Sequence, residues 1–143
     1  MKIRFSFSLR LAVIFCAATF LVLISCNKDD GDDGHGEGDT VAPVLSLNSP
    51  TDGQTFMNGD TIHISAMATD ETSMHEYVWT IKDAGGTTVH EATISVHDET
   101  EHDIEEMYEV SGIASNNTWT ISIQLEDHGG NMDEKMVTVN VNP

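Results

Sequence analysis

Histidine and carboxylate side chains gather in three separate stretches of the chain, residues 70–75, 97–103 and 127–131. Each stretch follows a run in which apolar and polar residues alternate. Imidazole combined with carboxylate suits zinc, copper or nickel, whereas carboxylates with an amide oxygen suit calcium. In the second stretch, His97 and His102 are separated by four residues, a spacing compatible with one ion bound in a loop.

These side chains predict a divalent-metal site, provided that the three stretches meet in space. The candidate ligands are four histidines and two aspartates: His75, His97, His102, His128, Asp98 and Asp127. Two other interpretations stay open, since loop residues are polar by default. One is calcium bound by carboxylates (Asp70, Asp98 and Asp127), and the other is an acidic loop surface that is only solvated. His63 is a secondary metal candidate, for which a solvated outer strand face is the alternative.

Apolar residues alternate with polar ones through the last hundred or so residues, and no stretch shows a helical period. Turn residues divide this part into short segments. The pattern predicts an all-β fold, a seven-stranded immunoglobulin- or fibronectin-type-III-like β-sandwich. We expect its strands around residues 44–47, 61–69, 77–81, 92–96, 104–110, 118–125 and 137–141.

Two features indicate how these strands are arranged. The turn Asp83-Ala84-Gly85-Gly86 predicts a tight hairpin that keeps the fourth strand beside the third, as in the fibronectin-type order. Trp79 in the third strand is expected to anchor the core between the two sheets. In this order, the loops after the second, fourth and sixth strands gather at one end, which would bring the candidate ligands together.

The first 25 residues have the features of a secretory signal. Lys2, Arg4 and Arg10 precede and flank an almost wholly apolar run over residues 11–24, which is short for a membrane-spanning helix, the alternative. Leu23-Ile24-Ser25-Cys26 resembles the lipobox of bacterial lipoproteins, in which the chain is cleaved before the cysteine and lipid is attached to it. That resemblance implies a mature chain that is anchored to the membrane through lipid on Cys26. No further cysteine follows, so the folded part has no disulfide or thiolate site.

Residues 26–40 are rich in Asp and Gly, and we expect a disordered acidic tether before a domain at residues 41–143. All 24 acidic residues follow Cys26, but only three of the 6 basic ones do. Such a charge repels nucleic acid and attracts cations. The residues Lys28, Asp29 and Asp30 resemble the acidic export signal of Bacteroidota-type lipoproteins, which implies a surface-exposed outer-membrane lipoprotein. An ordinary acidic linker is the alternative.

Two motifs carry a further resemblance over residues 41–143. Asp39-Thr40-Val41-Ala42-Pro43 and Glu126-Asp127-His128-Gly129-Gly130-Asn131 resemble the start and the late turn of bacterial Ig-like repeats. The segment from Gly59 to Ala66 is similar to a histidine-bearing, Ig-like lipoprotein family of unknown function. Lys82, Thr120 and Ser122 stand where histidines of that family are expected.

The sequence lacks the motifs of the common enzyme classes, including the Gly-x-Ser-x-Gly elbow and His-Glu-x-x-His. We therefore expect a non-catalytic, lipid-anchored Ig-like module of the cell envelope that binds a divalent ion, zinc, copper or calcium. The alternative is an adhesion or assembly module that binds an envelope protein or a glycan.

Overall fold

The computed structural model describes residues 38–143, and within them it has eight strands and no helix. The strands are β1 (Val44–Ser49), β2 (Gln54–Met57), β3 (Thr61–Thr69), β4 (Met74–Lys82), β5 (Thr88–Ser95), β6 (Glu101–Glu109), β7 (Asn117–Asp127) and β8 (Met132–Asn142). The predictions for the signal segment, for Cys26, for Lys28, Asp29 and Asp30, and for most of the tether lie outside the described residues. No helix in residues 38–143 is long and apolar enough to span a bilayer.

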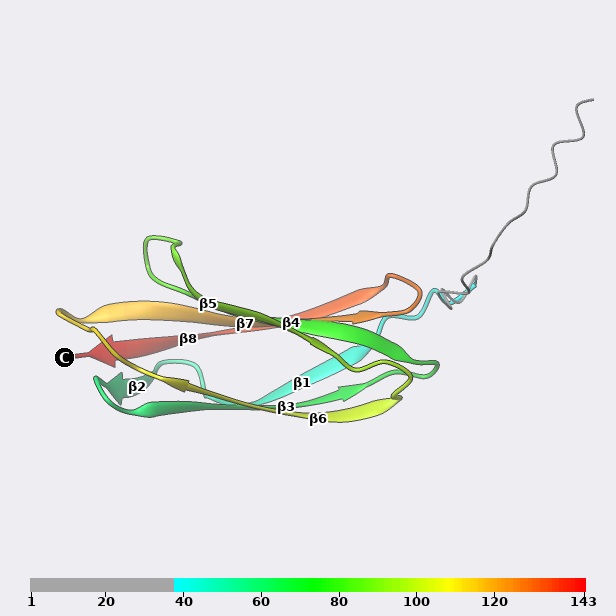
Figure 1. Ribbon diagram of the computed structural model, residues 1–143, viewed down its shortest axis with the longest axis horizontal. Coiled ribbons are helices and arrows are strands. Elements are labelled where there is room, and N and C mark those ends of the chain that lie inside the picture. Colours follow the sequence, from blue (N-terminus) through cyan, green and yellow to red (C-terminus); the bar gives the residue numbers. More distant parts are fainter. Residues whose placement is uncertain (1–37) are drawn as a thin grey trace, which may run out of the picture. The chain divides into compact units, whose positions relative to one another are not determined.

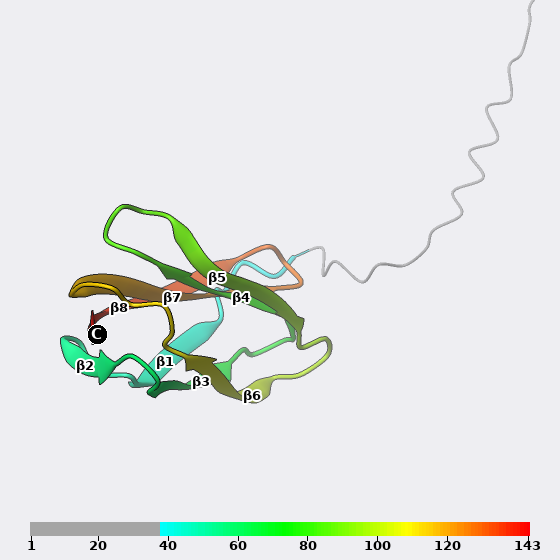
Figure 2. The ribbon, with the colours of Figure 1, turned by 60° about the vertical axis from the view of Figure 1, so that its left-hand side comes forward.

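The strands form two sheets that face each other (Figure 1). The smaller sheet has the order β1-β3-β6, and the larger has the order β2-β8-β7-β4-β5. This confirms the predicted all-β sandwich of immunoglobulin and fibronectin-III-like type. The hairpin after β4 places β5 beside it, as the fibronectin-type order requires, and Figure 2 shows this hairpin at the edge of the larger sheet.

The structure has one strand more than the seven predicted. The additional strand is β2, which is four residues long and pairs in parallel with β8. Phe56 is its only buried side chain. The segment therefore lacks the repeated alternation from which a strand is predicted. The prediction of seven strands was wrong for this reason.

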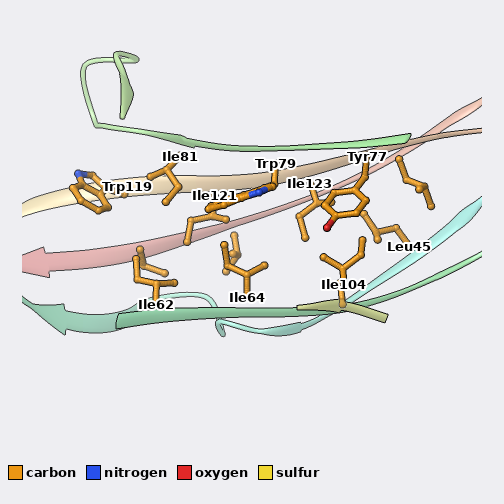
Figure 3. Close-up of a cluster of buried hydrophobic side chains, with 14 of the residues drawn as sticks. Leu45, Ile62, Ile64, Tyr77, Trp79, Ile81, Ile104, Trp119, Ile121 and Ile123 are labelled. Carbon is orange, nitrogen blue, oxygen red and sulfur yellow. The ribbon is translucent and has the colours of Figure 1, made fainter. Parts of the chain in front are cut away.

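Alternate side chains of the facing strands fill the space between the two sheets (Figure 3). Ile62 and Ile64 of β3 project toward Ile81 and Ile121 of the larger sheet. Trp79 is only 3% exposed and lies among them, the position expected of a core anchor. Burying a large apolar side chain contributes roughly 1.5–3 kcal/mol. The core therefore fixes the strands whose ends carry the polar loops.

The loops that carry the candidate ligands meet at one end of the sandwich. The chain passes from β3 to β4, from β5 to β6 and from β7 to β8 at this end, next to the start of β1 (Figure 1). The three polar stretches of the sequence are therefore neighbours in space.

Candidate metal centre

Backbone hydrogen bonds tie two of these loops to the start of β4. The amide of Val96, just after β5, donates to the carbonyl of His75 at 3.0 Å. The amide of His128, just after β7, donates to the carbonyl of Ser73 at 3.3 Å. These two bonds bring His97 and His128 close to His75.

His75 lies at an irregularity in β4. In the pairing with β7, Met74 lies opposite Asp127 and Glu76 lies opposite Glu126, which leaves His75 without an opposite residue. Such a bulge changes the direction of a side chain, and bulges are common beside functional sites. Met74 is fully buried in the core, whereas His75 is half-buried and its ring contacts the two neighbouring loops.

The imidazole rings of His75, His97 and His128 form a triangle, which we call the histidine triangle. The ring centroid of His75 lies 4.5 Å from that of His97 and 4.9 Å from that of His128, and the remaining pair is 4.9 Å apart. One ring nitrogen of each residue lies within 4.8 Å of the others, and Nδ1 of His97 is 3.0 Å from Nε2 of His128. Two nitrogens bound to one tetrahedral zinc ion are roughly 3.3–3.4 Å apart. Small side-chain adjustments would therefore enclose an ion.

The Nδ1 atom of His75 is buried and has no hydrogen-bond partner within the described part of the chain. A buried polar atom without a partner costs about 1–3 kcal/mol, and folded proteins leave few of them. A metal ion bound to this nitrogen would remove that cost. His97, the third member, is exposed, so the triangle is open to solvent on one side.

His102 and Asp98 lie outside the histidine triangle, although both were candidate ligands. His102 is opposite the buried Ala68 of β3, so its side chain is directed toward the space between the sheets. Its Nδ1 is 2.7 Å from Oε2 of Glu99. Asp98 is exposed and adopts a left-handed backbone conformation (φ 65°), which aspartate tolerates better than most residues and which turns the chain after His97.

Asp127 belongs to a second group of side chains, together with Asp39 and Asp70. One carboxylate oxygen of each lies within 4.8 Å of the others, and Asp70 and Asp127 are buried. Asp70 is in one of the three polar stretches, but the sequence did not suggest Asp39 as a ligand. The available signal was the motif Asp39-Thr40-Val41-Ala42-Pro43, which places an aspartate just before β1.

His63, the secondary candidate, is exposed on β3 and lies directly opposite Met107 of β6, whose exposed fraction is 67%. The pair points away from the core, as predicted. No group of three histidine or carboxylate ligands within residues 38–143 includes His63. A further histidine, His90, packs its ring against Trp79 with 4.0 Å between the centroids, which accounts for it as a partly buried core residue.

A comparison with protein families matches residues 43–141 to the bacterial Ig domain family. The chain belongs to this family. The match runs from the residue before β1 to the next-to-last residue of β8, so all three loops of the histidine triangle lie within this bacterial Ig domain.

A comparison with solved structures finds similar chains at low sequence identity. The fibronectin(III)-like modules of CbhA from Clostridium thermocellum are 18% identical; the alignment covers 68% of this chain and 94% of the other, with a TM-score of 0.45. The sporulation control protein Spo0M from Bacillus subtilis is 9% identical, with 71% and 49% covered and a TM-score of 0.48. A comparison with curated proteins found no match.

Proposed function

We propose that this bacterial Ig domain binds a transition-metal ion through His75, His97 and His128. The observation that supports the proposal most strongly is the convergence of three imidazoles from three chain segments, one ring nitrogen of each lying within 4.8 Å of the others. His75, one of the three, also has a buried Nδ1 without a hydrogen-bond partner within the described residues. Each histidine alone would be an ordinary polar residue near a loop. A shared metal ion would explain why the three imidazole rings lie so close together. The role is binding, since Ig-like and fibronectin-III-like domains are typically non-catalytic.

The donor set favours zinc or copper(II) over harder cations, because imidazole suits both metals. Three protein ligands leave a fourth position for water or for a donor from a partner. The formal net charge of −18 raises the concentration of cations around the protein and so favours capture.

The proposal also includes the location of the protein. Lipid is attached at Cys26, and an export signal is formed by Lys28, Asp29 and Asp30. Bacterial Ig domains are often extracellular or surface domains, which agrees with a position on the outer membrane. Cells supplied with radiolabelled palmitate are expected to label the wild type and not the Cys26→Ser variant. If the wild type took up no label, the lipid anchor would be excluded.

Calorimetric titration of the full chain, in detergent and with an affinity tag that contains no histidine, tests the metal site. We expect micromolar or tighter binding of zinc or copper(II). Removing two ligands in the His75→Ala/His97→Ala variant should weaken it by about 100-fold or more. The matched control is His63→Ala, which removes an exposed histidine from the other sheet and should keep the wild-type affinity.

The absence of zinc and copper binding, or equal binding by the double variant, would overturn this function. The bacterial Ig domain would then keep the coarser role of a binding or assembly module, with a protein or a glycan as its partner.

A further inference from the structure

We infer a second cation site, independent of the histidine triangle, in which Asp39, Asp70 and Asp127 bind calcium. These three aspartates come from the segment before β1, from the β3–β4 loop and from the end of β7. One carboxylate oxygen of each lies within 4.8 Å of the other two. We call this group the aspartate cluster.

The buried carboxylate of Asp70 indicates that the cluster binds a ligand. It is only 9% exposed, and its Oδ2 is buried without a hydrogen-bond partner within the described residues. Its other oxygen, Oδ1, accepts the amide of Thr72 at 2.8 Å, which fixes the orientation of the carboxylate. A buried carboxylate oxygen is costly unless it is paired. A cation that Oδ2 helps to bind in the aspartate cluster would supply the missing partner.

The other two carboxylates are also held in place by hydrogen bonds. The oxygens of Asp127, which is 1% exposed, accept the backbone amide and the side-chain Nδ2 of Asn131, both at 2.8 Å. Oδ1 of Asp39 accepts the amide of Val41 at 3.0 Å. Each carboxylate oxygen has two acceptor positions, so these bonds leave room for a metal ligand bond.

Within residues 38–143, no basic side chain offsets the charge of the aspartate cluster. Residues 38–143 contain two lysines and no arginine. Lys135 contacts Asp133 at 2.7 Å, and Lys82 ends β4, roughly 26 Å along the strand from Met74. Three carboxylates this close repel one another. Because all the donors are oxygens and the site has no imidazole, the chemistry favours calcium over zinc or copper.

A calcium ion here would clamp the chain where it enters the domain. Nδ2 of Asn131 already donates to the carbonyl of Asp39 at 3.3 Å. Gly129 makes this approach feasible, because a Cβ at this position would lie 2.9 Å from the carbonyl oxygen of Asp39. The ion would therefore join the segment before β1 to the β7–β8 loop.

Thermal unfolding of the full chain with and without calcium tests the aspartate cluster. Extracellular calcium modules bind with dissociation constants of about 0.1–1 mM, so about 5 mM calcium should raise the melting temperature of the wild type by roughly 4–18 °C, the larger shift belonging to the tighter binding. Asp70→Asn should abolish this shift. Without calcium, Asp70→Asn should melt at or above the wild-type temperature, because it removes one of three repelling charges and keeps the acceptor for Thr72. Glu71→Gln, an exposed neighbour with the same charge change, should keep the full calcium shift.

If Asp70→Asn does not fold, Asp39→Asn gives a second test, because Asp39 lies before β1. This variant should also lose the calcium-induced rise in melting temperature. The His75→Ala/His97→Ala variant should keep it, whatever its response to zinc. The inference would be overturned by a wild type that does not respond to calcium. It would also be overturned by a full shift in both aspartate variants, or by a calcium shift that depends on the histidines.

Discussion

Nδ1 of His97 lies 3.0 Å from Nε2 of His128, although the two residues are 31 positions apart in the sequence. In a hydrogen bond between two imidazoles, one ring donates and the other accepts. Metal binding needs a free lone pair on both facing nitrogens, so an incoming ion must replace this bond. The pair is thus held near the geometry of two ligands before any ion is bound.

His102 provides a direct test of which histidines bind metal. Its Nδ1 is engaged by Glu99 at 2.7 Å, and it lies outside the histidine triangle. We expect zinc titrations of His102→Ala to give an affinity within about 3-fold of the wild type, whereas His97→Ala should lose about 10–100-fold. Equal losses in the two variants would show that the ion lies between β6 and the β5–β6 loop instead.

Asp133 links the two sheets, and its contribution to stability should depend on pH. Its Oδ2 accepts the amide of Leu45 at 2.9 Å, and Lys135 donates to the same carboxylate at 2.7 Å. Burial raises the pKa of Asp133, but the bonds from Lys135 and Leu45 outweigh it, so the pKa lies below the usual 3.8. Because the folded pKa is the lower one, the stabilisation is present above the unfolded pKa and is lost as the pH falls through the folded pKa.

Asp133→Asn should therefore lower the free energy of unfolding by about 1 kcal/mol near pH 7. The difference from the wild type should be smaller at an acidic pH well below 3.8, because the pH then falls through the lowered pKa of Asp133. Urea unfolding at the two pH values measures it, with Glu134→Gln, an exposed neighbour, as the control. A difference of the same size at both pH values would mean that the charge of Asp133 contributes nothing.

The strands were predictable from the sequence where one face of a strand is buried. The strand expected at residues 61–69 coincides with β3, because Ile62, Ile64, Ala66 and Ala68 all enter the core. The edge strand β2 has a single buried side chain, Phe56, and was not predicted. Alternation of apolar and polar residues predicts a strand that is buried on one face. It gives no prediction for a strand that is held mainly by backbone hydrogen bonds.

The meeting of the loops at one end also followed from the predicted strand order. The strand order did not predict which side chains of these loops are in contact. His75 depends on the bulge between Met74 and Glu76, and a one-residue change in register alters the face that a side chain occupies. His102 continues the strand alternation of β6 and lies opposite the buried Ala68, outside the histidine triangle. Asp39 lies in a stretch whose hydrophilic composition predicted a tether, so its contact with the β7–β8 loop was not foreseen.

Trp79 should dominate the stability of the core. It is 3% exposed, and its ring packs against His90. We expect Trp79→Ala to cost about 3–5 kcal/mol in free energy of unfolding, because it leaves a large cavity. Trp79→Phe should cost clearly less, since it also removes the buried Nε1, which has no hydrogen-bond partner within the described residues. Urea unfolding measures both variants, and Met136→Ala, at a position that is 65% exposed, should stay within about 0.5 kcal/mol of the wild type. Equal losses for the alanine and phenylalanine variants would contradict this account of the Trp79 ring.

Gly129 connects the aspartate cluster to the loop that carries His128. A Cβ at this position would lie 2.9 Å from both the carbonyl oxygen of Asp39 and Nδ2 of Asn131, so Gly129→Ala must push the segment before β1 away. We expect this variant to weaken calcium binding by about 10-fold, since one of three carboxylates is displaced. Zinc binding should change much less, because the amide of His128 keeps its bond to Ser73.

The matched control is Gly130→Ala, at a position with φ 79° and no atom near the added Cβ. It strains the same loop, at a cost of roughly 1 kcal/mol, without touching Asp39. Calorimetric titration of both variants with calcium and with zinc separates crowding at Asp39 from a general loosening of the loop. If Gly129→Ala kept the wild-type calcium affinity, Asp39 would not be a ligand, and Asp70 and Asp127 alone would have to hold the ion.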